Sequence, residues 1–226
     1  MIGAIGLFAL ALVALLYALP FGLRLLAERR LARRCAAERL LVLSFDDGPG
    51  PTLTPKLLAL LEAEDARATF FPLGQRALAH PDVLTEAVRR GHEIGCHSQR
   101  HGHSFRIGPI RAFRDAREGL ETLRPWLGAR PLFRPPFGKL DLATWLQLTR
   151  RGVRLGWWTL DSGDTAGADD PEPIVQMVLD AGGAVVLLHD FDGRPERSDY
   201  VLAVTERLLV AARQHGLRVV PLGAVA

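Results

Sequence analysis

We expect an α/β protein whose parallel sheet is closed, or nearly closed, into a barrel, with one transmembrane helix in front of it. About seven strand–helix units alternate over residues 40–226, a pattern typical of parallel sheets. Four of the expected strands end in polar clusters, and the first 23 residues carry no charged side chain. An open, doubly wound sheet fits the same alternation and stays an alternative.

Composition limits the class of protein. The chain has 226 residues, of which 48% are hydrophobic and 23% charged, and it has two cysteines. Such a chain forms one domain of moderate size and is neither disordered nor a disulfide-stapled miniprotein. The net charge of +3 is local: residues 1–40 hold six arginines and two glutamates, and the rest carries 22 basic and 23 acidic side chains. No nucleic-acid partner is therefore expected.

The uncharged N-terminal segment is expected to cross a membrane. As a helix, residues 1–23 would span about 35 Å, and a hydrocarbon core is about 30 Å thick. A cleaved signal peptide or a buried core helix are the alternatives, but no basic residue precedes the segment and no small-residue cleavage site follows it. We therefore expect an uncleaved anchor at 1–23, a basic juxtamembrane segment at 24–39 and a folded domain at 40–226.

The folded domain is expected to alternate strands and helices in order. Its first strand is a continuous apolar run, typical of a strand buried on both faces, and later helices begin at Pro-Asp or end at Gly. Strands are expected at 40–45, 68–72, 92–96, 132–134, 154–160, 184–189 and 218–221. Helices are expected at 54–64, 81–91, 108–127, 141–150, 171–181 and 198–214. No G-x-G-x-x-G motif or P-loop is present, so no nucleotide cofactor is expected.

The first strand ends in two neighbouring carboxylates, Asp46 and Asp47, followed by Gly48-Pro49. In parallel α/β folds the chemistry gathers at the carboxyl ends of the strands. Adjacent side chains point to different sides, so one carboxylate can bind a metal while the other acts as a base. The alternative is an acidic turn, because D-G-P is a good turn sequence.

The third expected strand is followed by His97 and His101, four residues apart. On one face of a helical turn, two such histidines can bind one metal ion, and Asp47 would complete a set with open positions for water. Solvent-exposed histidines without a ligand are the plainer reading. A non-haem iron oxygenase uses similar ligands, but its H-x-[DE] spacing and β-sandwich do not fit this chain.

Two further clusters suggest groups for acyl-transfer chemistry. After Arg134, two prolines lack N–H groups, so the N–H groups of Phe137 and Gly138 stand out as donors to an oxyanion. Arg134 can stabilise an ionised carboxylate such as Asp46. His189 ends another strand, where a nearby carboxylate can keep it protonated to serve a leaving amine. A proline turn with a surface arginine and a histidine that caps a loop are the alternatives.

Together, and in this order, the clusters resemble the polysaccharide deacetylase family, the NodB-homology domain of carbohydrate esterase family four. The resemblance covers about residues 40 to 222 and rests on five motifs. Its motif T-F-D-D-G-P corresponds to Ser44–Pro49, H-[ST]-x-x-H to His97–His101, R-x-P-[FY] to Arg134–Phe137, and L-x-H-D to Leu187–Asp190. The motif D-x-x-D-W is met in part by Asp161 and Asp164, with Thr165 where tryptophan is usual. The resemblance therefore does not predict the shape of this wall of the substrate pocket.

The resemblance implies a distorted (β/α) barrel that hydrolyses an N- or O-acyl group from a sugar. It implies one divalent metal ion, with zinc expected and cobalt, nickel or iron also suited. The metal ligands would be Asp47, His97 and His101; the base Asp46, tuned by Arg134; and the acid His189, partnered by Asp164. Leu188 would line the pocket for the acetyl methyl group, and the Phe137 N–H would bind the oxyanion.

The resemblance also implies an N-acetylated glycan substrate, such as peptidoglycan or a chitin-like oligomer, outside the cytoplasm. The arginines just after the expected span favour the cytoplasmic side instead, where a lipid-linked sugar precursor would be the natural substrate. A membrane-tethered sugar-binding domain that has lost activity is a third alternative. Such a domain should have lost a ligand or the base, and none is missing.

Overall fold

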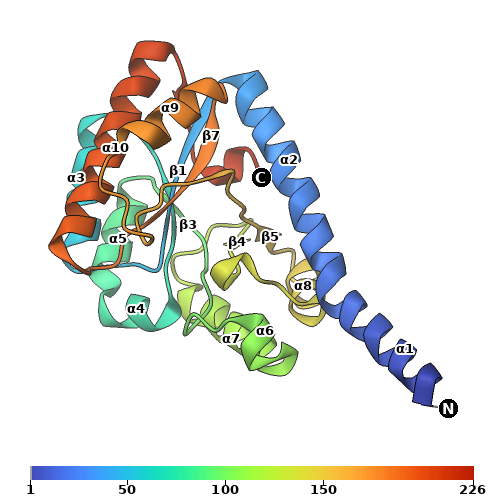
Figure 1. The fold of residues 1–226 in the computed structure, drawn as a ribbon. Helices are drawn as coiled ribbons and strands as arrows, with labels where there is room; N and C mark the ends of the chain where they lie inside the picture. The colour runs from blue at the N-terminus through green and yellow to red at the C-terminus, as the bar shows by residue number, and fades with distance from the viewer. Residues whose placement is uncertain (1) are drawn as a thin grey trace.

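A computed structural model describes residues 2–226 and arranges their strands and helices as one barrel-like α/β domain (Figure 1). The strands are β1 (Leu40–Asp46), β2 (Thr69–Phe71), β3 (Glu93–Ile94), β4 (Leu132–Phe133), β5 (Arg154–Leu155), β6 (Leu160–Asp161), β7 (Ala184–His189) and β8 (Arg218–Val219). One parallel sheet has the order β3-β2-β1-β7-β6, with β8 beside the start of β1. Strands β4 and β5 form a second parallel pair, joined to the first sheet by a bridge between Cys96 and Phe133.

Strand β1 is the centre of the barrel. All its residues are buried, and it pairs with β7 along one edge and with β2 and β8 along the other. Burial of both faces of the strand explains its continuous apolar sequence. The register aligns Asp46 with His189 of β7 and with Phe71 of β2, so the polar ends of these strands meet at one edge.

The expected strand at 154–160 is wrong in one respect, because the chain forms two short strands there instead of one. Between them, the carbonyl oxygens of Gly156 and Trp157 accept hydrogen bonds from the buried guanidinium of Arg134, at 3.0 and 3.4 Å. These carbonyls are therefore turned away from a strand ladder. Strand pairing resumes at Thr159, whose N–H donates to Val185. Within the described residues no ladder joins β5 to β6, and the barrel is open there.

Helices surround the barrel (Figure 1). They are α3 (Leu53–Ala63), α4 (Gly74–Ala79), α5 (Pro81–Arg89), α6 (Ser104–Ile107), α7 (Pro109–Leu123), α8 (Leu142–Arg150), α9 (Glu172–Asp180) and α10 (Pro195–His215). The six expected helices are confirmed, with ends shifted by up to four residues. The short helices α4 and α6 were not expected, because four to six residues are too few to show a helical period.

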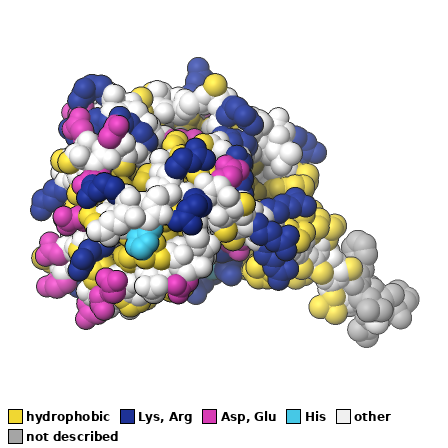
Figure 2. All heavy atoms as spheres, turned by 90° about the horizontal axis from the view of Figure 1, so that it is seen from above, with side chains coloured by type: hydrophobic (Ala, Val, Ile, Leu, Met, Phe, Trp, Pro, Cys, Tyr) yellow, Lys and Arg dark blue, Asp and Glu magenta, His cyan; other side chains and the backbone are white. Residues whose placement is uncertain are grey.

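The N-terminal segment forms one continuous helical rod. It consists of α1 (Ile2–Val13), a π-helical turn η1 (Ala14–Ala18) and α2 (Leu19–Glu38), and its start projects beyond the body of the domain (Figure 1). Leu10–Glu38 is long and apolar enough to cross a membrane by length and composition. On the coloured part of the rod next to the body, hydrophobic side chains predominate, with basic side chains where rod and body meet (Figure 2).

The second half of α2 packs against the barrel. Leu31 and Cys35 are buried there, and Arg34 donates a hydrogen bond to the carbonyl of Val225, near the C-terminus. The segment expected to be a basic juxtamembrane stretch is thus an ordered helix in contact with the domain that follows it.

Close packing beside the open seam of the barrel leaves no room for a side chain at Gly156. A Cβ atom there would lie 2.5 Å from Cζ of Phe71 and 3.0 Å from Cδ2 of Leu222. Gly156→Ala is expected to lower the free energy of unfolding by about 1–3 kcal/mol, the usual cost of overpacking a core. Gly128→Ala is the matched control, because a Cβ there meets open space. Urea denaturation measures both, and equal stabilities would contradict this packing.

Candidate active site

Asp46 and Arg134 form a buried ion pair at the carboxyl end of β1. The Nη1 atom of Arg134 lies 2.8 Å from Oδ1 of Asp46 and 3.0 Å from Oγ of Ser44, and the arginine side chain has no exposed surface. Burial raises the pKa of the Asp46 carboxyl, and the positive charge of Arg134 offsets part of this effect. A carboxylate with a raised pKa is a stronger base than a solvated one.

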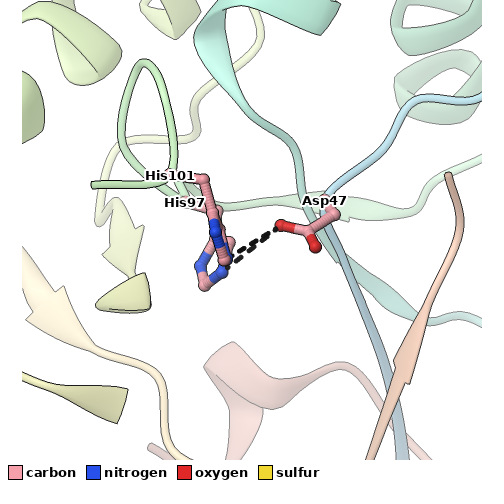
Figure 3. A group of neighbouring side chains, drawn as sticks. All are labelled: Asp47, His97 and His101. Atoms are coloured by element: carbon pink, nitrogen blue, oxygen red, sulfur yellow. Dashed lines mark ion pairs between the residues drawn. The ribbon is translucent and has the colours of Figure 1, made fainter. Parts of the chain in front are cut away.

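Asp47, His97 and His101 converge beside this pair (Figure 3). Oδ1 of Asp47 lies 3.3 Å from Nε2 of His101 and 3.6 Å from Nε2 of His97. This oxygen is buried and has no hydrogen-bond partner among the described residues, as expected of an atom that can bind a cation. One carboxylate and two imidazoles form a donor set that suits zinc and other first-row metals.

The tautomer of His97 is set by its backbone partner. Its Nδ1 lies 2.7 Å from the carbonyl oxygen of Arg134, which can only accept, so Nδ1 carries the proton and Nε2 keeps its lone pair. Burial lowers the pKa of His97 to about 3, which keeps the ring neutral. Both effects leave Nε2 ready to bind a metal.

The expected helical turn between His97 and His101 is wrong. The two residues lie in an irregular loop in which Ser98 and His101 adopt left-handed backbone conformations, with φ of 69° and 62°. The loop is held from outside: the N–H of Gln99 donates to the Asp115 carbonyl, and the Asp115 carboxylate accepts from the N–H of Arg100. The imidazoles therefore meet through tertiary contacts and not through helical periodicity.

His189 stands across the site in a second charged group. Its Nδ1 lies 2.9 Å from Oδ1 of Asp164, whose Oδ2 lies 3.1 Å from Nη1 of Arg197. Burial lowers the pKa of His189, but the hydrogen bond and negative charge of Asp164 outweigh it and raise the pKa to about 9. This histidine is therefore protonated at neutral pH and can give up a proton.

The loop after Arg134 presents one free backbone donor. Phe137 adopts a left-handed conformation (φ 57°), and within the described residues its N–H has no acceptor. Gly138 was the other expected donor, but its N–H is used within the turn, where it donates to Pro135. The Phe137 ring is half exposed and packs against His101, with ring centroids 4.5 Å apart.

Leu188 does not face the site. It pairs in register with Phe45, whereas His189 pairs with Asp46, and successive residues of a strand point to opposite faces. Leu188 is fully buried in the hydrophobic core on the far side of the sheet. Leu187 aligns with Ser44, on the same face as Asp46, and is thus the leucine of this motif that faces the site.

Comparison with known proteins agrees with this geometry. The family model described as polysaccharide deacetylase matches residues 33–156. The chain belongs to this family. A peptidoglycan-N-acetylglucosamine deacetylase from Bacillus cereus is 33% identical over 186 residues, covering 81% of this chain and 86% of the relative. A chitooligosaccharide deacetylase from Bradyrhizobium sp. is 30% identical, covering 88% and 95%.

The fold of this polysaccharide deacetylase family member is confirmed by solved structures. The peptidoglycan N-acetylglucosamine deacetylase Bc1960 matches with a TM-score of 0.76 and 25% identity, over 84% of this chain and 89% of that one. The barrel expected from the motifs is thus the fold that the chain adopts.

Two contributors to the site were not expected from the sequence. Arg197, at the start of α10, pairs with Asp164, and nothing in its local sequence marks it. Asp190 belongs to a motif but was given no role. Its Oδ2 accepts from the Thr54 hydroxyl at 2.7 Å, and its carbonyl accepts from the N–H of Gly50. Asp190 thereby fastens the end of β7 to the loop after β1.

A separate cavity lies away from these residues. It measures about 520 Å³ and lies between α2, α8 and β5. Apolar side chains, arginines and Thr149 line it, with no Asp, Glu or His side chain. It lacks the groups that hydrolysis requires, so the candidate active site of this deacetylase-family chain is the cluster at the strand ends.

The raised pKa of His189 is open to direct measurement. In a titration followed by NMR, its imidazole is expected to lose its proton near pH 9. Asp164→Asn should lower this pKa, because the hydrogen bond and the negative charge of Asp164 are the main groups that oppose the effect of burial. Asp169→Asn, which removes an exposed carboxylate, is the control. An unchanged pKa in Asp164→Asn would contradict the pairing.

The same pairing makes stability depend on pH. A pKa raised from 6.5 to about 9 means that the folded state holds the proton more tightly. The resulting stabilisation is fully present below pH 6.5 and is lost as the pH rises through 9.

Proposed function

We propose that the chain is a metal-dependent hydrolase that removes N-acetyl groups from a glycan such as peptidoglycan or a chitin-like oligomer. One observation carries the proposal. Asp46, paired with Arg134, and protonated His189, paired with Asp164, lie at the ends of the neighbouring strands β1 and β7, beside a set of possible metal ligands. The named activities of the relatives support the same substrate class, since they act on peptidoglycan and chitooligosaccharides.

Asp47, His97 and His101 would hold one divalent metal ion. The unpartnered Oδ1 of Asp47 and the fixed tautomer of His97 support this assignment. When bound, the ion supplies a Lewis acid that polarises the acetyl carbonyl and lowers the pKa of water. We propose zinc, and the ligand set also suits cobalt, nickel or iron.

Asp46 would be the general base. It accepts a proton from the attacking water, whose oxygen forms the new bond to the acetyl carbon. Arg134 holds the Asp46 carboxylate in place and limits the rise of its pKa, so that the group is ionised when the water arrives. Ser44 has no role in the reaction in this scheme; its hydroxyl oxygen only accepts a second hydrogen bond from the Arg134 guanidinium.

Phe137 and His189 would serve the later part of the reaction. The Phe137 N–H donates to the oxyanion as the carbonyl carbon becomes tetrahedral. His189 then gives its proton to the sugar nitrogen as the C–N bond breaks, so that acetate and a free amine leave. Leu187, on the same face of β7, would contact the acetyl methyl group. Thr165 is exposed where the family has tryptophan, so the wall beside the sugar is less enclosed.

We further propose that residues 1–23 anchor the enzyme in a membrane and that the catalytic domain lies outside the cytoplasm, where cell-wall glycans are found. The five arginines of α2 favour a second candidate, a deacylase of a lipid-linked sugar precursor on the cytoplasmic side. A C-terminal reporter that works in one compartment only separates the two.

Substitution of the base and of a metal ligand tests the proposed chemistry. Asp46→Asn is expected to abolish acetate release from N-acetylated chitooligosaccharides, because Asn cannot accept the proton, while metal content stays at the wild-type level. His101→Ala should lose both activity and metal. Acetate release and metal content are measured on the same purified full-length preparations. His80→Ala is the control, since this histidine lies outside the site.

The outcomes separate the candidates. Wild-type turnover in either Asp46→Asn or His101→Ala would contradict the proposed roles of these residues. A wild-type protein that binds the oligosaccharide but releases no acetate, with any of the suited metals, would favour the inactive sugar-binding alternative. Release from a lipid-linked N-acetyl sugar alone would favour the precursor deacylase.

A further inference from the structure

We propose that Arg24, in the membrane-proximal helix α2, is a positioning residue that holds the loop presenting the Phe137 N–H. The N-terminal helix would then be a working part of the active site as well as an anchor. The inference rests on the proposed function, because it concerns the donor that would bind the oxyanion.

Arg24 reaches from α2 to the loop at the edge of the barrel. Its Nη1 donates to the carbonyl oxygen of Gly138 at 2.6 Å, and its Nε donates to Glu28 at 2.6 Å. The guanidinium also stacks over the rings of Trp157 and Trp158, with distances of 5.1 and 4.7 Å to the ring centroids. Its side chain is only 15% exposed, so these contacts are little weakened by solvent.

The loop needs a support of this kind. Phe137 and Gly138 are both left-handed, with φ of 57° and 61°, and a left-handed phenylalanine is strained unless its surroundings hold it. Within the loop, Gly138 and Lys139 donate their N–H groups to Pro135 and Pro136. These bonds close the turn, and the bond from Arg24 fixes the next peptide carbonyl from outside.

Space at Gly138 points to the same role. A Cβ there would lie 1.9 Å from Nη1 of Arg24 and 2.8 Å from the ring of Trp158. The glycine lets the guanidinium approach the backbone directly. Loss of the Arg24 side chain would leave a gap beside the backbone that presents the Phe137 N–H.

The test compares full-length variants in detergent. Arg24→Ala is expected to lower kcat for acetate release on the order of 10-fold to 100-fold, the range for a misplaced catalytic group, with little change in KM, metal content or thermal midpoint. Arg24→Lys should recover part of kcat, because an ammonium can still donate to the Gly138 carbonyl. Arg29→Ala, an exposed arginine of the same helix, should match the wild type.

Hydrogen exchange gives a readout that does not need turnover. In Arg24→Ala the amide protons of Gly138 and Lys139 should exchange faster, while those of β1 keep their protection. Wild-type kcat and wild-type exchange in Arg24→Ala would overturn the inference. If Arg24→Ala does not fold, Glu28→Ala decides, because it removes the acceptor that holds Nε of Arg24: a reduced kcat supports the role and an unchanged kcat overturns it. A wild-type protein without acetate release contradicts the proposed function instead, and the exchange arm still tests the contact.

Discussion

A fully buried arginine, Arg134, ties together the parts of this molecule that matter for its chemistry. Its guanidinium donates hydrogen bonds to Asp46 and to the carbonyl oxygens of Gly156 and Trp157. These two carbonyls are then not available for strand pairing, and the barrel is open between β5 and β6. Its own carbonyl fixes the ring of His97. A buried charge is stable only when it is fully paired, so each of these contacts constrains the others. The proposed base Asp46, the proposed metal ligand His97 and the shape of the barrel thus all depend on Arg134.

The candidate site gives the proposed acid and the proposed base different environments. Asp46 is buried against an arginine, so burial pushes its pKa up and the positive charge holds it back. His189 is buried against Asp164, and there the carboxylate outweighs burial, so the ring keeps its proton to about pH 9. Titratable groups whose environments push their pKa values apart are the usual sign of an acid–base pair. The parallel register of β1 and β7 places the two side by side.

Sequence reasoning located the strand ends and most of the site, because motif residues follow the strands directly. It failed where position depends on contacts distant in sequence. The loop that carries His101 is shaped by α7, which holds Asp115. Arg197 lies in α10, eight residues after the end of β7, and contacts Asp164 from there. The period of two along a strand is enough to place Leu187, and not Leu188, on the same face as His189.

The most direct test of the central constraint is a double-mutant cycle on the free energy of unfolding, with Arg134→Met, Asp46→Asn and the double variant. Arg134→Met alone should cost about 3–5 kcal/mol, because it leaves a buried carboxylate without its partner. The double variant should lose much less than the sum of the single losses, since no charge is then left unpaired. Strictly additive losses would show that the two residues do not depend on one another and would contradict the account.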